Sequence, residues 1–251
     1  MNKIYWSDLG IEITRKCNMN CAHCMRGPAE NIDINIDYID KILKTTAFIG
    51  TIHFAGGEPS LNPGAILETL KIIKKYNIPV INFDITINGK IINNIFIEAI
   101  TQWNDYCKKF SFKSHTSSVR LTIDEFHGSI PSKNIQKLIP FPFFWIQLDK
   151  YKNSPNEKTI DNLGNAKKLI GYKKDTPSIR FPYKIYKYNN NFYIISHFVL
   201  TCKGNLIKNS DYEYINEKSI IFANYNNLIE ILKNQKNIMP INNDFLLNLP
   251  I

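Results

Sequence analysis

Short apolar runs alternate with amphipathic helical segments through the first 150 residues of this 251-residue chain. In the clearest helical segment, 64–76, Ile66, Leu70 and Ile73 recur on one face. Such alternation is typical of strand–helix–strand units, whose strands form a parallel sheet covered by the helices. We therefore predict an α/β fold. The expected strands are 9–14, 49–54, 80–87, 119–123 and 143–148, and the expected helices are 38–46, 64–76, 92–103 and 132–138.

The last third of the chain has a different pattern. Two apolar runs flank the turn Lys203-Gly204-Asn205, which is typical of a β-hairpin. We expect a core of residues 1–180 and a small hairpin-and-helix extension of residues 181–251 that packs on it. Residues 150–191 are rich in Lys, Asn, Tyr and Pro and predict no clear strand. The expected elements of the extension are a strand at 192–201, a strand from Leu206 onward, and a short helix at 228–233.

Composition and charge exclude several classes of protein. A hydrophobic share of 44% is typical of a globular chain with a sizeable core. The sequence has no apolar run of about 18 residues or more, and residues 1–8 lack the features of a secretion signal. We therefore expect a cytoplasmic protein that does not insert into a membrane. The net charge of +9 comes from lysines scattered along the chain, so we expect no nucleic-acid partner.

Three of the five cysteines lie in one short loop, Cys17-Asn-Met-Asn-Cys21-Ala-His-Cys24. Without an export signal, this spacing favours a metal site over a disulfide framework. Thiolates select iron–sulfur clusters, zinc or copper(I), and three cysteines leave one corner of a four-iron cluster open to another ligand. A structural zinc site with His23 or a distant histidine as fourth ligand is the alternative, although zinc sites usually contain two separated ligand pairs. Cys107 and Cys202 stand alone and are expected to be buried as small hydrophobic residues.

Other polar motifs also follow the ends of predicted strands. They are Gly56-Gly57-Glu58, Asn88 and Asp124-Glu125-Phe126-His127. The carboxyl ends of parallel strands meet at one edge of a sheet or barrel, and ligands bind there. We therefore expect these motifs and the cysteine loop to surround one site.

Two of these motifs have alternative interpretations. Gly56 and Gly57 let the backbone approach a ligand closely, but they also suit a simple tight turn. Asp124 and His127 are candidate catalytic residues that relay protons or position a substrate. Capping of the following helix and satisfaction of backbone groups by this segment is the structural alternative.

The cysteine loop and Phe54-Ala-Gly-Gly-Glu-Pro59 together resemble the radical S-adenosylmethionine (SAM) superfamily. Its members pair a CxxxCxxC loop after the first strand with a GGE-type motif after the second, and the resemblance covers about residues 10–127. It implies a partial (β/α)6 TIM-like barrel. It also implies a [4Fe–4S] cluster held by Cys17, Cys21 and Cys24, whose open iron binds the methionine part of SAM.

The resemblance further implies which residues contact SAM. His23 is placed near adenine, although a packing role is the alternative, and Thr122 and Asp124 face the ribose and methionine. Gly164-Asn165-Ala166 is similar to a Gly-Arg-Ala element near SAM, with Asn in place of Arg. The full set of implied SAM contacts is His23, Gly56, Gly57, Glu58, Asn88, Thr122 and Asp124.

The implied activity is reductive cleavage of SAM to methionine and a 5′-deoxyadenosyl radical, which abstracts hydrogen from a substrate. A flavodoxin or ferredoxin is the implied electron donor. A peptide or protein is the favoured substrate, because the segment around Cys202 resembles a reduced form of the C-terminal extensions of peptide-modifying members. We expect no leader-binding segment before the first strand. The alternatives are a small molecule or nucleotide, as in deazapurine synthases; a glycyl-radical activating enzyme; and a non-enzymatic zinc or redox-sensing binding protein.

Overall fold

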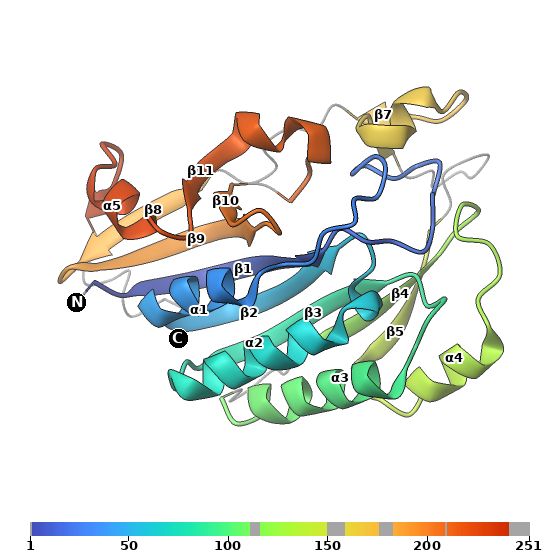
Figure 1. The fold of residues 1–251 in the computed structure, drawn as a ribbon, viewed down its shortest axis with the longest axis horizontal. Helices are drawn as coiled ribbons and strands as arrows, with labels where there is room; N and C mark the ends of the chain where they lie inside the picture. Colours follow the sequence, from blue (N-terminus) through green and yellow to red (C-terminus); the bar gives the residue numbers. More distant parts are fainter. Residues whose placement is uncertain (1, 111–115, 150–158, 176–182, 209, 241–251) are drawn as a thin grey trace.

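The computed structural model describes residues 2–110, 116–149, 159–175, 183–208 and 210–240. A 10-stranded sheet runs through the molecule (Figure 1). Its central strands are β1 (Ile4–Thr14), β2 (Thr46–Gly56), β3 (Val80–Ile87), β4 (Ser118–Ile123), β5 (Phe144–Leu148) and β9 (Asn191–Leu200). They are parallel and lie in the order β9-β1-β2-β3-β4-β5. The predicted α/β fold is confirmed.

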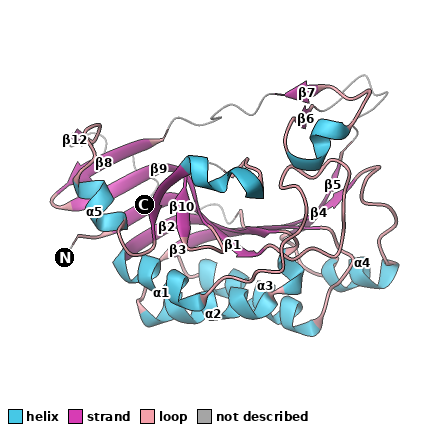
Figure 2. Cartoon of the chain, turned by 45° about the horizontal axis from the view of Figure 1, so that its top comes forward, coloured by secondary structure: helices cyan, strands magenta, loops and turns pink. Residues whose placement is uncertain are grey.

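Four helices cover one face of this sheet: α1 (Ile36–Thr45), α2 (Pro63–Lys75), α3 (Asn94–Cys107) and α4 (Ser132–Leu138) (Figures 1 and 2). The first three begin at asparagines, namely Asn35, Asn62 and Asn93, whose side chains accept a hydrogen bond from a backbone N–H of the first turn. Such caps satisfy N–H groups that have no partner within the helix. None of the described helices is long and apolar enough to cross a membrane.

The sheet separates an apolar core from a polar cavity. On β2, Ile52 and Phe54 are buried under the helices, whereas His53 alternates with them and points to the opposite face. The same alternation places Phe83 in the core and Asp84 in the cavity on β3. The helices thus close one face, and the other face is left for ligands.

The predicted C-terminal hairpin is also confirmed: β9 pairs antiparallel with β10 (Asn205–Ile207). Its first strand, however, pairs parallel with β1, so the extension continues the core sheet at the edge opposite β5. The division at residue 180 stays a prediction.

Part of the segment 150–191 lies outside the described residues. The remaining elements are β6 (Ile160–Asp161), β7 (Lys174–Asp175), β8 (Lys184–Tyr188), β11 (Ile221–Asn224), β12 (Met239–Pro240), α5 (Leu228–Lys233) and the 3-10 turns Pro59–Leu61, Gly164–Lys168 and Tyr214–Ile220.

Candidate active site

The loops that follow β1, β2 and β3 are joined by hydrogen bonds at one edge of the sheet. Gly57 N–H donates to the Thr14 carbonyl at 2.9 Å, which links the second loop to the first. The Glu58 carboxylate accepts the Asn88 N–H at 2.8 Å, and the Asn88 side-chain amide donates to Asn18 at 2.9 Å inside the cysteine loop. The predicted meeting of these motifs is therefore confirmed.

Gly56 and Gly57 are required by the packing of the two strand ends. A Cβ on Gly56, whose φ is +147°, would lie 2.0 Å from the Thr14 carbonyl oxygen. A Cβ on Gly57 would lie 2.3 Å from the Lys16 carbonyl oxygen. These contacts are with protein backbone, so the glycines position the chain that leads into the cysteine loop. Both residues also line the cavity, and their contact with SAM stays a prediction.

We expect Gly57→Ala to displace the start of the cysteine loop. The added methyl group has no room, and forcing atoms into a packed site costs about 1–3 kcal/mol. Iron retention after anaerobic reconstitution and the urea midpoint should both fall. Gly64→Ala is the matched control, because the nearest atom lies 4.0 Å from its Cβ and alanine suits a helix. Wild-type iron content in Gly57→Ala would contradict this account of the loop.

Glu58 is buried at 2% exposure beneath the loops. One of its oxygens accepts hydrogen bonds from the backbone and the hydroxyl of Ser60, and the other accepts from Asn88. Burial raises the pKa of the carboxyl group, against the effect of these hydrogen bonds. Its demonstrated partners are protein groups, and a direct contact with SAM stays a prediction.

The 3-10 turn at 164–168, about 140 residues after the cysteine loop in the sequence, forms hydrogen bonds with that loop. The Asn165 N–H donates to the Cys24 carbonyl at 2.9 Å, and its side-chain amide donates to the Cys21 carbonyl at 3.1 Å. A Cβ on Gly164 would lie 2.5 Å from the Cys24 carbonyl oxygen. Asn165 therefore contacts the loop backbone at the place where the resemblance expects an arginine near SAM.

A buried arginine anchors the other end of the loop. Arg15 is fully buried and forms ion pairs with Glu12 at 2.8 Å, Glu30 at 3.0 Å and Glu217 at 2.6 Å. Its guanidinium also lies 4.2 Å from the ring centroid of Tyr214. Because Glu217 belongs to the C-terminal part of the chain, this cluster fixes that part to the end of β1.

The three loop cysteines fit an iron–sulfur cluster. All are free and partly exposed, and burial raises the pKa of Cys17. Burial and the negative charges of Cys17 and Cys24 raise the pKa of Cys21 to about 11. Thiolates so close to one another repel unless a cation binds them, and their softness suits iron–sulfur clusters. Cys107 and Cys202 are buried in the apolar core, as expected, and leave the trio without a fourth cysteine.

Asp124, His127 and His23 form a compact group after β4. One Asp124 oxygen accepts hydrogen bonds from the Phe126 and His127 backbone N–H groups and contacts His127 Nδ1 at 2.7 Å. The other oxygen is buried without a hydrogen-bond partner among the described residues, 3.6 Å from His23 Nε2. The His23 ring stacks on Phe126 at 4.4 Å. These hydrogen bonds show that Asp124 organises a turn. Asp124 does not cap the next helix, α4, because that helix begins only at Ser132.

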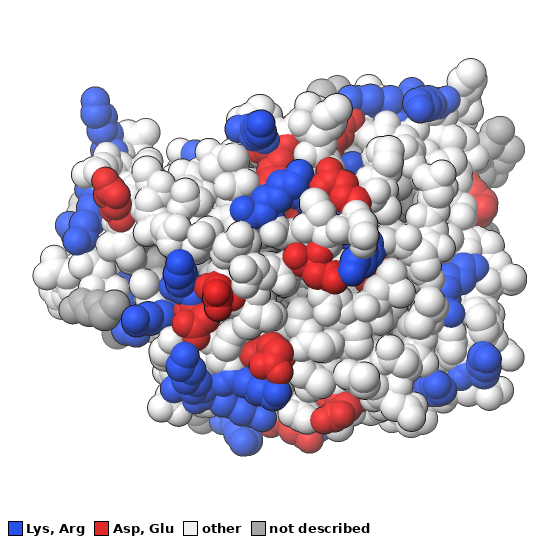
Figure 3. Space-filling model, viewed as in Figure 1, with Lys and Arg blue, Asp and Glu red and all other residues white. Residues whose placement is uncertain are grey.

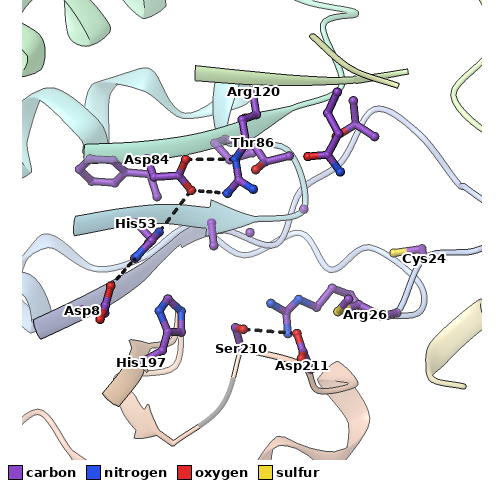
Figure 4. Close-up of a pocket in the computed structure, with 18 of the residues that line it drawn as sticks. Asp8, Cys24, Arg26, His53, Asp84, Thr86, Arg120, His197, Ser210 and Asp211 are labelled. Atoms are coloured by element: carbon purple, nitrogen blue, oxygen red, sulfur yellow. Dashed lines mark hydrogen bonds and ion pairs between the residues drawn. The ribbon is translucent and has the colours of Figure 1, made fainter. Parts of the chain in front are cut away.

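A cavity of about 990 Å³ extends from Cys24 over the polar face of the sheet (Figure 4). Its wall contains the predicted site residues His23, Cys24, Gly56, Gly57, Thr122 and His127, whereas Glu58, Asn88 and Asp124 lie behind it. Burial lowers the pKa of His23, against the attraction of Asp124. The loops that follow β1, β2 and β4 therefore line one space, and the loop after β3 supports it from behind through Asn88.

The polar residues on the cavity face of the strands were not predicted from the sequence. Five such residues, each from a different strand, line the cavity (Figure 4): Asp8, His53, Asp84, Arg120 and His197. The available signal was a single polar residue between buried apolar neighbours, as in Phe83-Asp84-Ile85.

A family model of the radical SAM superfamily matches residues 11–135. The chain belongs to the radical SAM superfamily. It is therefore an enzyme that uses a [4Fe–4S] cluster and SAM, which decides against a non-enzymatic zinc or redox-sensing protein. Cys17, Cys21 and Cys24 lie at the CxxxCxxC-like site of the family, and their role as ligands of the cluster stays a prediction.

The fold of this radical SAM enzyme is similar to that of native anSMEcpe with bound AdoMet and Cp18Cys peptide, at a TM-score of 0.55 and 11% identity over 92% of this chain and 81% of that chain. SuiB of Streptococcus suis, bound to the precursor peptide SuiA, gives a TM-score of 0.45 and 10% identity over 92% of this chain and 65% of that chain. No curated protein sequence matches the chain. The predicted partial TIM-like barrel is confirmed.

Proposed function

We propose that this radical SAM enzyme modifies a peptide or protein by removing a hydrogen atom from it. When bound, the cluster and SAM supply a 5′-deoxyadenosyl radical, the agent that abstracts the hydrogen. The observation that carries the proposal is the size and chemistry of the cavity beside Cys24. A space of about 990 Å³ exceeds the needs of one small cofactor, and its wall offers both hydrogen-bond donors and acceptors.

The charges in this wall balance one another. Four acidic and four basic side chains line the same space. The acidic residues are Asp8, Asp84, Asp149 and Asp211, and the basic residues are Arg26, Arg120, Lys184 and Lys208. Arg120 pairs with Asp84, and Arg26 donates to the Tyr212 carbonyl. Basic and acidic side chains are also interspersed on the molecular face shown in Figure 3. A substrate with alternating amide donors and acceptors suits such a wall better than a polyphosphate does.

A protein of similar fold binds the two ligands that the proposal requires, SAM and a peptide. Native anSMEcpe, which shares this fold, has AdoMet and a peptide bound together. In the present chain, β9 borders the same cavity through Ile195, Ser196 and His197, and Lys208, the residue after β10, also lines it. The C-terminal extension would thus form one side of the peptide site.

We assign His127 to proton handling next to the substrate. The Asp124 carboxylate contacts its Nδ1 atom, which favours the tautomer with the proton on Nδ1 and leaves Nε2 as an acceptor. Asp124 does not line the cavity and is therefore a positioning residue. An acidic one-electron donor such as a flavodoxin or ferredoxin fits the net charge of +9.

The substrate class is tested by offering two kinds of compound to the reconstituted enzyme. Short peptides encoded next to its gene are incubated anaerobically with enzyme, SAM and dithionite, and nucleotide and deazapurine precursors are treated in parallel. We expect one peptide to change in mass and to increase 5′-deoxyadenosine release in proportion. Proportional release with a nucleotide precursor and none with any peptide would contradict the proposal.

A further inference from the structure

A cluster of one carboxylate and two imidazoles lies in the cavity, apart from the cysteine loop. Asp8 on β1, His53 on β2 and His197 on β9 each place one ligand atom within 4.8 Å of the other two. Asp8 and His197 are directly opposite each other on paired strands. The His53 Nε2 atom lies 3.2 Å from the Asp8 carboxylate, and the two imidazole centroids are 4.7 Å apart (Figure 4).

His53 is oriented by a carboxylate on its other side. Asp84 contacts His53 Nδ1 at 3.2 Å and is itself held by Ser118 and Arg120. Histidines that bind metals usually donate their second ring N–H to such a carboxylate, which fixes the tautomer and makes the free nitrogen a better ligand. Here that arrangement turns Nε2 toward Asp8 and the cavity.

The protonation states of His197 and Asp8 suit a cation. Burial and the nearby charge of His53 lower the pKa of His197 to about 4, so its imidazole is neutral at pH 7 and has a free lone pair. Burial opposes ionisation of Asp8, but the hydrogen bond from His53 lowers its pKa, so the carboxylate is ionised. Burial opposes protonation of His53, but its hydrogen bonds with Asp8 and Asp84 raise its pKa, so His53 must release a proton when a cation binds.

We propose that Asp8, His53 and His197 bind one divalent transition-metal ion, with Asp84 as the residue that positions His53. Two imidazoles and one carboxylate suit zinc, iron(II) or cobalt(II), and copper binds imidazole as well. Three protein ligands leave at least one coordination position for water or a substrate oxygen. Binding displaces the His53 proton. The site does not depend on the proposed peptide substrate or on SAM.

The test uses the cluster-loaded enzyme, in which the three loop thiols are already occupied. Zn²⁺ is added anaerobically, excess ion is removed by desalting, and zinc per chain is counted beside iron; calorimetry gives the Kd and the number of protons released. We expect about one zinc per chain. Asp84→Asn should weaken binding by about 10–100-fold, the usual effect of losing a carboxylate that orients a histidine ligand.

His53→Ala and His197→Ala should each abolish zinc retention, whereas Gln147→Ala, a change elsewhere in the cavity wall, should leave it intact. Circular dichroism shows whether each variant is folded. The wild-type enzyme decides the matter even where a variant fails to fold: no retained zinc and no heat of binding would overturn the proposal. Retention of zinc by a folded variant that lacks both His53 and His197 would do the same.

Discussion

Anaerobically reconstituted Cys21→Ala should contain little iron and should release no 5′-deoxyadenosine above background. Cys21 is the middle cysteine of the loop, where burial and the charges of Cys17 and Cys24 raise the pKa of its thiol. Two thiolates cannot hold three corners of a four-iron cluster, so we expect iron to fall from about four atoms per chain to below about one. Iron and sulfide analysis with absorbance near 400 nm measures the loss.

Cys107→Ala is the matched control for this variant. Cys107 is fully buried in the apolar core, where burial raises the pKa of its thiol to about 12. Its replacement removes a thiol without removing a ligand, so iron content and SAM cleavage should stay at wild-type levels. Equal iron loss in Cys21→Ala and Cys107→Ala would mean that the cysteine loop has no special role in holding the cluster.

Arg15→Met should lower the free energy of unfolding by about 3–5 kcal/mol, the usual cost of removing one partner of a buried ion pair. The change leaves the carboxylates of Glu12 and Glu217 buried, at 1% and 3% side-chain exposure, without their cation. It also releases the C-terminal segment from the residue two positions before Cys17. Urea denaturation of the reduced, metal-free chain measures the effect.

Lys16→Met is the control at the adjacent position. Lys16 pairs with Asp33, but both side chains are 40% exposed. Such surface pairs are worth about 0–1 kcal/mol. Equal destabilisation by the two substitutions would show that the buried cluster around Arg15 contributes nothing beyond an ordinary surface charge.

The fold and the cysteine site were largely predictable because both depend on local sequence patterns. The strand at 80–87 and the helices at 132–138 and 228–233 have the predicted bounds, since apolar periodicity reports which face each element buries. The meeting of the four loops followed from one rule, that parallel strands share an edge at their carboxyl ends. Of the structural alternative for Asp124, the part that the structure shows is the satisfaction of backbone groups, because this carboxylate accepts the N–H groups of Phe126 and His127 in a turn.

The remaining features depend on contacts between distant parts of the chain. Arg15 and Glu217 are 202 positions apart, and nothing near either residue indicates its partner. His197 meets Asp8 only because β9 pairs with β1, a neighbour relation that local periodicity does not specify. For the same reason, the packing role of Gly56 and Gly57 depends on the backbone of residues 14–16.

The most direct test of the central claim is SAM cleavage by the wild-type enzyme. The protein is reconstituted without oxygen, its iron and sulfide are counted, and 5′-deoxyadenosine is measured by chromatography after addition of SAM and dithionite. We expect about four iron and four sulfide per chain and 5′-deoxyadenosine formation that requires both additions. A protein that holds no iron, or that holds the cluster and never cleaves SAM, would contradict the account.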